Sequence, residues 1–381
     1  MREVAVIGAG STVFGKLPAE SIEELGRKAV QAAIKHAGIK PKEINFCHCA
    51  TCFGGMVIGQ RILKHVGVTG IEIVNVENAC AGGATAFRGV WLGVASGLYD
   101  MGIAIGVESM TTSPIAGKLI LPAEGDLEGV LGNSTVAHWA LRMRRHMEKY
   151  GTTLEQFAKV SVKNHHNGCL NPFSQYKKEL TVEEVLSSRM ICDPITLLQC
   201  CPNTDGAAAL ILCSLEVAKR YTTEPIKIAA SVLKGGDYIF RQKEMAISDM
   251  TMCCAREAYE MAGCGPEDVD LVELHDPFTY NEIAHCEELG LCAEGEGGRL
   301  IDDGVTQITG RNPVNPSGGL LSRGHPLSAT GVEQIAELVW HLRREARDRQ
   351  VKDAKVGLAH TMGGQVAGLE GGAVCIHILK R

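Results

Sequence analysis

The chain has 381 residues, of which 45% are hydrophobic and 22% are charged, and its formal net charge is −6. The length exceeds that of most single domains and the composition is that of a globular protein, so we expect two or three folded domains. The slightly acidic balance and the aromatic content of 5% argue against nucleic acid as a partner.

The first ten residues, MREVAVIGAG, lack the basic and long apolar segments of a signal peptide, and no apolar run reaches the ~18 residues that span a bilayer. We therefore expect a cytoplasmic protein that does not enter a membrane. The fifteen cysteines, an odd number without a secretion signal, are expected to be reduced thiols. Three of them lie in residues 47–52 (CHCATC) but lack the paired spacing of a zinc site, so we expect no bound metal.

Residues 4–7 predict a buried strand that leads into a turn at residues 8–10 (GAG), and residues 21–37 have helical periodicity. A strand followed by Gly-x-Gly can also bind a dinucleotide. Val13, however, stands where that fingerprint requires its third glycine, so we expect no dinucleotide site.

Strands and helices continue to alternate along the chain and predict stacked α and β layers. The polar character of residues 111–199 indicates an insertion, and from residue 225 a second series resembles the first in outline. We therefore predict two similar βαβ-rich halves, residues 1–224 and 225–381. The other predicted strands lie at residues 71–76, 101–107, 226–230, 269–274 and 356–359, and the other helices at 81–97, 134–150, 154–167, 248–262 and 331–347.

Cys80 is the first candidate for chemistry. Residues 76–83 (VENACAGG) follow a predicted strand and open a predicted helix. At a helix start, free backbone N–H groups and the helix dipole favour thiolate over thiol, which makes Cys80 a candidate nucleophile. The small residues that follow would let a substrate carbonyl approach the sulfur. For this segment alone, a buried structural cysteine is the alternative interpretation.

His325 is the second candidate. Residues 315–331 (NPSGGLLSRGHPLSATG) predict a glycine-rich loop that presents this histidine just before a helix. Imidazole can accept a proton from a thiol and donate a hydrogen bond to an oxyanion near neutral pH. A structural loop histidine is the alternative for this segment alone.

Four segments, taken together and in order, resemble the fingerprints of the thiolase superfamily: residues 76–83, 275–278 (HDPF), 315–331 and 360–364 (HTMGG). The resemblance covers essentially the whole chain and is most specific in the block from NPSGG to GHP. It implies an α/β thiolase fold, with two halves in α-β-α-β-α layers and a loop-domain insertion. It also implies an acyltransferase that acts on thioesters of coenzyme A.

Within the superfamily, the chain looks most like the sterol-carrier-protein-type thiolases, which have His-Asp where other thiolases have Asn-Glu. Two positions depart from the relatives. Pro277 stands where a cysteine often follows His-Asp, and Thr361 stands where many thiolases have a second cysteine. The acid/base that serves the substrate α-carbon is therefore open, with His275 and His360 as candidates.

The resemblance also implies a mechanism. Cys80 attacks the 3-oxo carbonyl of the substrate and gives its proton to His325, while the backbone N–H groups of Cys80 and Gly363 form the oxyanion hole. His325, with help from His275, stabilises the departing enolate. Coenzyme A is then a co-substrate that takes the acyl group from Cys80, and no cofactor is expected to bind tightly.

The residues that bind coenzyme A have no compact sequence signature. The predicted helix at residues 134–150 carries Arg142, Arg144 and Arg145, whose charges could meet the phosphates of coenzyme A. A solvated helix face is the alternative interpretation.

Two other functions compete with 3-oxoacyl thiolysis. One is a retro-aldolase of the same superfamily acting on a 3-hydroxyacyl thioester, although that reaction needs no thiol nucleophile. The other is a non-catalytic protein that binds acyl thioesters or lipids. The resemblance further suggests a homodimer, a small OB-fold partner with a zinc ribbon, and an aromatic or branched substrate such as benzoylsuccinyl-coenzyme A.

Overall fold

The computed structural model describes residues 1–114, 116, 130–222, 224–237, 244–367 and 370–381. Residues 115 and 117–129 of the predicted insertion lie outside these ranges. The main strands of the first half are β1 (Val4–Ser11), β2 (Phe46–Ala50), β3 (Glu72–Val76), β4 (Met101–Ser109) and β7 (Asp205–Ser214). Those of the second half are β8 (Ile226–Lys234), β9 (Leu271–Glu273), β10 (Val356–Ala367) and β11 (Glu370–Lys380).

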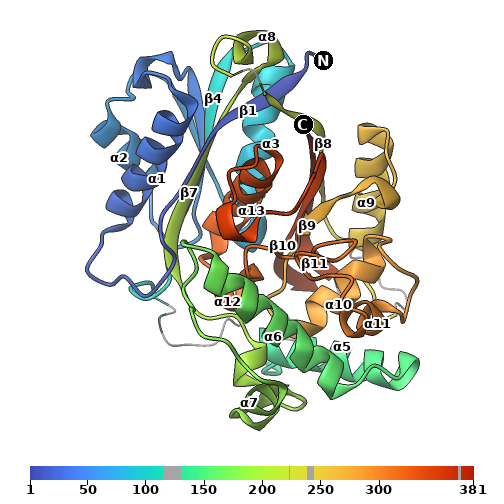
Figure 1. Ribbon diagram of the computed structural model, residues 1–381. Coiled ribbons are helices and arrows are strands. Elements are labelled where there is room, and N and C mark those ends of the chain that lie inside the picture. Colours follow the sequence, from blue (N-terminus) through green and yellow to red (C-terminus); the bar gives the residue numbers. More distant parts are fainter. Residues whose placement is uncertain (115, 117–129, 223, 238–243, 368–369) are drawn as a thin grey trace.

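These strands form one mixed sheet in the order β3-β2-β4-β7-β1-β8-β11-β10-β9 (Figure 1). In the first half, β2 runs parallel to β3 and β4, and the β4–β7 and β7–β1 pairs are antiparallel. The second half repeats this pattern, since β9 runs parallel to β10 and to an isolated bridge at Val314, and the β10–β11 and β11–β8 pairs are antiparallel. The two halves meet through two residue pairs between β1 and β8.

Helices form three layers around the two halves of the sheet (Figure 1). Helix α1 (Ile22–Ala37) packs on β1 and β7, and α9 (Asp249–Ala262) packs on β8 and β11. Between the halves lie α3 (Gly82–Ala95) and α13 (Leu327–Leu342). Three separate apolar clusters fill the spaces between these layers, which confirms the expected α-β-α-β-α order.

The central helix α13 is buried along its whole length, yet it carries charged side chains. Glu333 forms an ion pair with Arg323, and Glu337 forms one with Arg349. All four side chains are almost completely shielded from solvent. Removing one partner of such a pair costs roughly 3–5 kcal/mol, so these pairs hold α13 firmly to the segments before and after it.

The start of the chain corrects one prediction. The sequence GAG was expected to form a turn after residue 7, but β1 continues through it to Ser11. The reason is packing, because a Cβ atom on Gly10 would lie 2.4 Å from the carbonyl oxygen of Ala29 in α1. The glycines let the helix lie directly on the strand.

Residues 47–52 begin within β2. Cys47 and Cys49 are buried in the cluster beneath α1, whereas His48 lies against Gly89 of α3 on the other face of the sheet. The alternation of a strand therefore separates these potential ligands.

The segment between β4 and β7 forms α5 (Thr135–Tyr150), α6 (Leu154–Leu170), α7 (Val182–Ser187) and a small sheet of β5 (Met190–Cys192) and β6 (Ile195–Thr196). It packs on elements of the second half, because α6 contacts α10 (Thr279–Glu288), α11 (Gly297–Asp302) and α12 (Gly319–Arg323). The first half also contains the short helices α2 (Ile58–Leu63) and α8 (Leu215–Ala218). None of the described helices is long and apolar enough to cross a membrane.

Candidate active site

Cys80 lies where the sequence predicted, between the end of β3 and the start of α3. The turn that carries it is tight. Ala79 adopts a left-handed φ of 48°, and its backbone N–H donates to the carboxylate of Glu77 at 2.7 Å. A non-glycine residue in this region stores strain that the surroundings must hold, and such strain often accompanies a functional site.

The two central helices cross through glycines. A Cβ atom on Gly83 of α3 would lie 2.2 Å from the carbonyl oxygen of Ser328, and one on Gly331 of α13 would lie 2.7 Å from the backbone nitrogen of Ala84. No larger residue fits at either position without moving a helix backbone. This close crossing brings the start of α3 next to the start of α13, and thus Cys80 next to His325.

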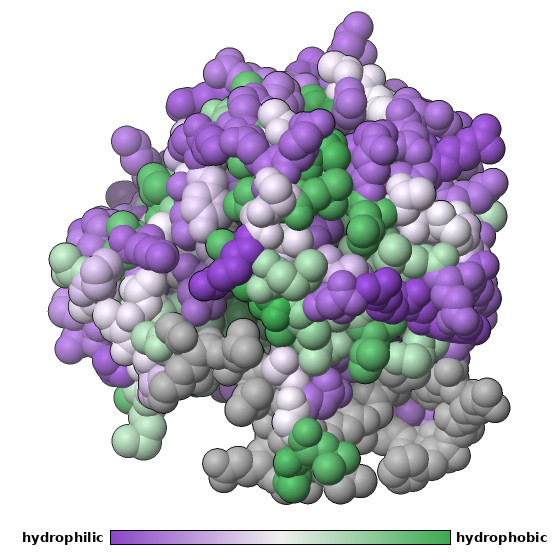
Figure 2. Space-filling view, turned by 90° about the horizontal axis from the view of Figure 1, so that it is seen from below, coloured by the Kyte–Doolittle hydropathy of each residue, from purple (hydrophilic) through white to green (hydrophobic). Residues whose placement is uncertain are grey.

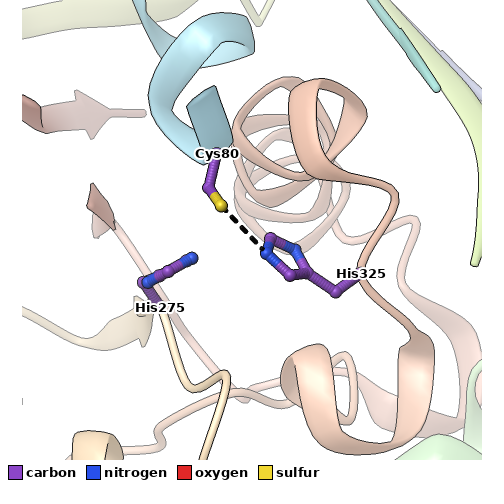
Figure 3. Close-up of side chains that lie close together, drawn as sticks. All are labelled: Cys80, His275 and His325. Carbon is purple, nitrogen blue, oxygen red and sulfur yellow. Dashed lines mark hydrogen bonds between the residues drawn. The ribbon is translucent and has the colours of Figure 1, made fainter. Parts of the chain in front are cut away.

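The Cys80 sulfur and the Nε2 atom of His325 are 3.3 Å apart (Figure 3). The other ring nitrogen, Nδ1, lies 2.8 Å from the hydroxyl oxygen of Thr330. That hydroxyl donates its own proton to the carbonyl of Pro326, so it accepts from Nδ1–H. Nε2 is then the unprotonated nitrogen and can accept the thiol proton.

Thr204 holds the backbone of the histidine loop. Its hydroxyl accepts a hydrogen bond from the backbone N–H of His325 at 3.0 Å. The preceding residue, Gly324, has a φ of 110°, and a Cβ atom there would lie 2.7 Å from the Thr204 hydroxyl. Glycine is therefore required for both conformation and space.

Burial raises the pKa of the Cys80 thiol to about 12, and burial also lowers the pKa of His325 to about 3. Hydrogen bonds from the backbone N–H groups of Cys80 and Gly364 act in the opposite direction on the thiol. The expectation that the helix start alone would favour a thiolate is therefore wrong for the resting site. The pair is therefore neutral at pH 7.

His275 joins this pair. It follows β9, is buried, and its ring centroid lies 5.2 Å from that of His325. Figure 3 shows its side chain reaching toward the same space as Cys80 and His325. Neither of its ring nitrogens has a hydrogen-bond partner among the described residues.

His360, the other candidate, belongs to a second group of histidines. It lies on β10, and its ring centroid is 4.5 Å from that of His285 on α10. The Nδ1 atom of His285 is 2.6 Å from the carboxylate of Glu288. Burial lowers the pKa of His275, and nearby His325, His360 and His285 lower it further, so the two groups are electrostatically connected.

The two glycines of the HTMGG segment lie next to the Cys80 turn, and Gly363 packs directly against it. A Cβ atom on Gly363 would lie 2.3 Å from the carbonyl oxygen of Asn78. Gly364 has a φ of 71°, and its backbone N–H lies close enough to the Cys80 sulfur to lower the pKa of that thiol. The HTMGG segment thus places the backbone amide of Gly364 near the Cys80 sulfur.

The NPSGG block supports the loop without contacting the sulfur. The Asn315 side chain accepts the backbone N–H of Leu274 at 2.8 Å, and the Ser317 hydroxyl donates to Glu273 at 2.7 Å. Glu273 also forms a buried ion pair with Arg323 at 3.1 Å. These contacts tie the His275 segment to the His325 segment.

The arginines of α5 have partners within the protein. Arg142 is buried and donates to the carbonyl oxygen of Ile247 at 2.9 Å, so it does not belong to a solvated face. Arg144 pairs with Asp193, and Arg145 pairs with Glu244 at 3.0 Å. These contacts give no support to α5 as a phosphate site.

Family comparison agrees with this geometry. Residues 4–216 match the model described as "Thiolase, N-terminal domain", and residues 235–376 match "Thiolase C-terminal domain-like". The two models cover most of the chain, which therefore belongs to the thiolase family. The resemblance seen in the sequence is confirmed, as is the expectation of a thiolase-type acyltransferase.

Three relatives are similar over nearly the whole chain. An acetyl-CoA acetyltransferase of Methanothermobacter thermautotrophicus is 43% identical and covers 100% of both chains. Sterol carrier protein 2 of Bos taurus is 40% identical over 99% of this chain and 72% of its own length. The benzoylsuccinyl-CoA thiolase subunit BbsB of Thauera aromatica is 39% identical over 95% of each chain.

Two solved structures share the architecture. One, described as "Ltp2-ChsH2(DUF35) aldolase", has a TM-score of 0.85 and 26% identity over 98% of this chain and 97% of its own. The human mitochondrial 3-ketoacyl-CoA thiolase has a TM-score of 0.74 and 19% identity, and covers 100% of this chain and 98% of its own. The second likeness supports the fold alone.

Proposed function

We propose that this chain cleaves a 3-oxoacyl thioester of coenzyme A by thiolysis, through an acyl intermediate on Cys80. The observation that carries the proposal is the 3.3 Å contact between the Cys80 sulfur and an unprotonated Nε2 of His325. Covalent acyl transfer needs a thiol nucleophile, a base that a third group orients, and backbone N–H donors for the oxyanion.

In the proposed reaction, Cys80 attacks the 3-oxo carbon while its proton moves to Nε2 of His325. The backbone amides of Cys80 and of Gly363 and Gly364 in β10 hold the tetrahedral oxygen. The bond between C2 and C3 then breaks, and its electron pair leaves as a thioester enolate, which His325 and His275 stabilise. After the enolate is protonated at C2, the thiol of coenzyme A attacks the acyl group and releases Cys80.

One experiment separates this proposal from its competitors. Incubating the chain with a 3-oxoacyl thioester in the absence of coenzyme A should leave an acyl mass on the peptide that contains Cys80. A retro-aldolase, the class of enzyme to which the similar aldolase structure belongs, would cleave a 3-hydroxyacyl thioester and leave no acyl group on the protein. A non-catalytic binding protein would neither cleave substrate nor become acylated.

The acyl group is proposed to be aromatic or branched, such as that of benzoylsuccinyl-coenzyme A. The support is the 39% identity with the subunit BbsB of Thauera aromatica. A panel of 3-oxoacyl thioesters tests this, because kcat/KM should be highest for an aromatic or branched member. A clear preference for acetoacetyl-coenzyme A would instead favour the acetyl transfer named in the Methanothermobacter relative.

We further propose that a small OB-fold protein with a zinc ribbon completes the enzyme. The two names that point to an assembly are the thiolase subunit BbsB and the aldolase described with ChsH2(DUF35). Figure 2 shows apolar side chains among polar ones on the lower face of the molecule. The segment between β4 and β7 also carries exposed apolar side chains, which a partner could cover, among them Leu141, Leu186, Met190 and Leu197.

The partner proposal predicts that the purified chain alone cleaves a 3-oxoacyl thioester slowly and that adding the small protein restores the rate. The physical reason is that part of the coenzyme A site would come from the partner. Steady-state assays with and without the partner make the comparison. Full activity of the chain alone would leave the partner without a catalytic role.

A second prediction concerns the acid/base at the α-carbon. If His275 or His360 has this role, changing it to asparagine should slow exchange of the C2 protons of acetyl-coenzyme A for deuterium by ~10²–10⁴-fold. The buried His377, which lies 3.1 Å from the Ser231 hydroxyl, provides the matched control. Mass spectrometry measures the exchange, and unchanged rates in both variants would exclude both histidines.

A third prediction concerns a homodimer, which we propose to form along the β3 edge. β3 is an edge strand, so one side of its backbone has no neighbouring strand among the described residues. Val74 on this strand is exposed, as are Met56 and Val57 earlier in the chain. Val74→Lys should convert the dimer to monomer, whereas Met252→Lys at a similarly exposed position on α9 should not. Light scattering decides, and a wild-type monomer at micromolar concentration would contradict the proposal.

We also propose that the chain divides into two halves between residues 224 and 225. We further propose a cytoplasmic location. All fifteen cysteines are free thiols in the structure, as expected in a reducing compartment.

A further inference from the structure

Three potential metal ligands converge at the candidate active site. The sulfur of Cys80 and one ring nitrogen from each of His275 and His325 all lie within 4.8 Å of one another. In a tetrahedral zinc site, bond lengths of ~2.0–2.3 Å place neighbouring ligand atoms roughly 3.3–3.7 Å apart. The Cys80–His325 distance of 3.3 Å already has this spacing. The ring nitrogen of His275 lies within 4.8 Å of both atoms and has to move closer to them to complete the site (Figure 3).

His275 supplies an independent observation. Its side chain is buried, with an exposed fraction of 4%, and both ring nitrogens lack a hydrogen-bond partner among the described residues. Leaving a buried polar group unsatisfied is unfavourable, so a ligand that engages this ring removes that cost. No protein hydrogen bond has to break when the ring turns toward the other two ligands.

The neighbouring groups also suit a cation. The hydrogen bond between Thr330 and Nδ1 of His325 directs the lone pair of Nε2 toward the site, as an outer-shell partner does for a zinc ligand. The carboxylates of Glu108 and Glu77 are close enough to act on the Cys80 sulfur. The buried cation Arg323 is already paired with Glu273 and Glu333.

We propose that Cys80, His275 and His325 bind one Zn²⁺ ion, and that this ion blocks Cys80 reversibly. On binding, the Cys80 thiol loses its proton to solvent, the thiolate and the two neutral imidazoles bind the metal, and water takes the fourth position. No electron is transferred. The blocking of thiolysis rests on the proposed function, whereas the binding itself does not.

Cobalt substitution tests the binding without an activity assay. The full-length chain, freed of metal by a chelator, is titrated with Co²⁺ and then with Zn²⁺. We expect one Co²⁺ per chain with a thiolate-to-cobalt charge-transfer band and the visible bands of tetrahedral cobalt, both removed by Zn²⁺. Cys80→Ser should lose the charge-transfer band, and Cys253→Ser, which removes an exposed thiol on α9, should retain it.

His275 distinguishes this site from a simple cysteine–histidine pair. Losing even an outer-shell partner typically costs 10–100-fold in metal affinity, so His275→Ala should weaken Zn²⁺ binding by at least ~100-fold. Zn²⁺ should also slow the alkylation of Cys80 by iodoacetamide in the wild type. A charge-transfer band that survives Cys80→Ser, or equal Zn²⁺ affinity in His275→Ala, would overturn the inference.

The two proposals fail in different ways. If chelator-treated protein cleaves no thioester but shows the Cys80-dependent cobalt band, the metal-site proposal is supported and the proposed function is contradicted. If the protein cleaves a thioester but shows no cobalt band, the proposed function is supported and the metal-site proposal is contradicted.

Discussion

Cys80→Ser is expected to abolish thiolysis while leaving the fold intact. The serine hydroxyl has a far higher pKa than a thiol and is a poor nucleophile at this position, even with His325 beside it. Removing a nucleophile that acts as a unit with its base typically lowers kcat by ~10⁴–10⁶. The side-chain volume hardly changes, so the tight turn at Ala79 and the start of α3 should be preserved.

The measurement is the steady-state rate of thioester cleavage, together with the mass of the peptide that carries residue 80. Cys253→Ser, an exposed thiol remote from the candidate site, is the control and should behave as the wild type. Circular dichroism and thermal unfolding should be the same for all three proteins. A Cys80→Ser protein that retains the wild-type rate would exclude the covalent mechanism.

Much of the layered fold is readable in the sequence because its buried strands and amphipathic helices have strong periodicity. The strand at Met101–Ser109 and the helix at Ile22–Ala37 follow their predicted positions closely. The strands Asp205–Ser214 and Glu370–Lys380 were not predicted. The first lacks alternation because all ten residues are buried, and the second follows a segment rich in glycine.

The candidate site was partly predictable for a different reason. Cys80 and His325 each lie among small residues near a predicted helix start, and that local pattern can be recognised in the sequence. Thr330 lies only five residues after His325 in the same segment, so it could also have been identified from the sequence. Thr204 could not, because it reaches the site from another segment of the chain. Gly364 lies in the HTMGG segment, where the family resemblance pointed to the neighbouring Gly363.

The His285–Glu288 pair behind His360 gave no signal in the sequence. Its members lie three residues apart on α10, a common spacing on any charged helix, and only burial makes the pair notable. Burial also explains the wrong expectation of a thiolate at Cys80, since sequence pattern reports the helix start but not the loss of water around the sulfur. Desolvation dominates there.

The internal repeat explains how the two reacting groups meet. Cys80 follows β3 and precedes α3 in the first half, while His325 follows the Val314 bridge and precedes α13 in the second. The two groups therefore occupy equivalent places in the two halves. Packing α3 against α13 through Gly83 and Gly331 brings these equivalent places together.

His325→Ala is expected to lower the rate of thiolysis by at least ~10²–10³, because in the proposed mechanism this one residue both accepts the thiol proton and donates to the enolate oxygen. His166→Ala, an exposed histidine on α6 that contacts Glu179, is the control. Acylation of Cys80 by a 3-oxoacyl thioester, followed by mass spectrometry, isolates the first of these two roles.

The pH dependence of that acylation separates proton transfer from simple loss of packing. In the wild type, burial lowers the pKa of His325 to about 3, so the neutral imidazole is present from pH 8 down to pH 6 and the acylation rate should change little across this range. In His325→Ala, the thiol must ionise without a base, and burial raises the pKa of Cys80 to about 12. The rate should then rise by about tenfold for each pH unit, because the thiolate fraction does so below the pKa. Equal pH profiles for the two proteins would show that His325 does not take the proton of Cys80.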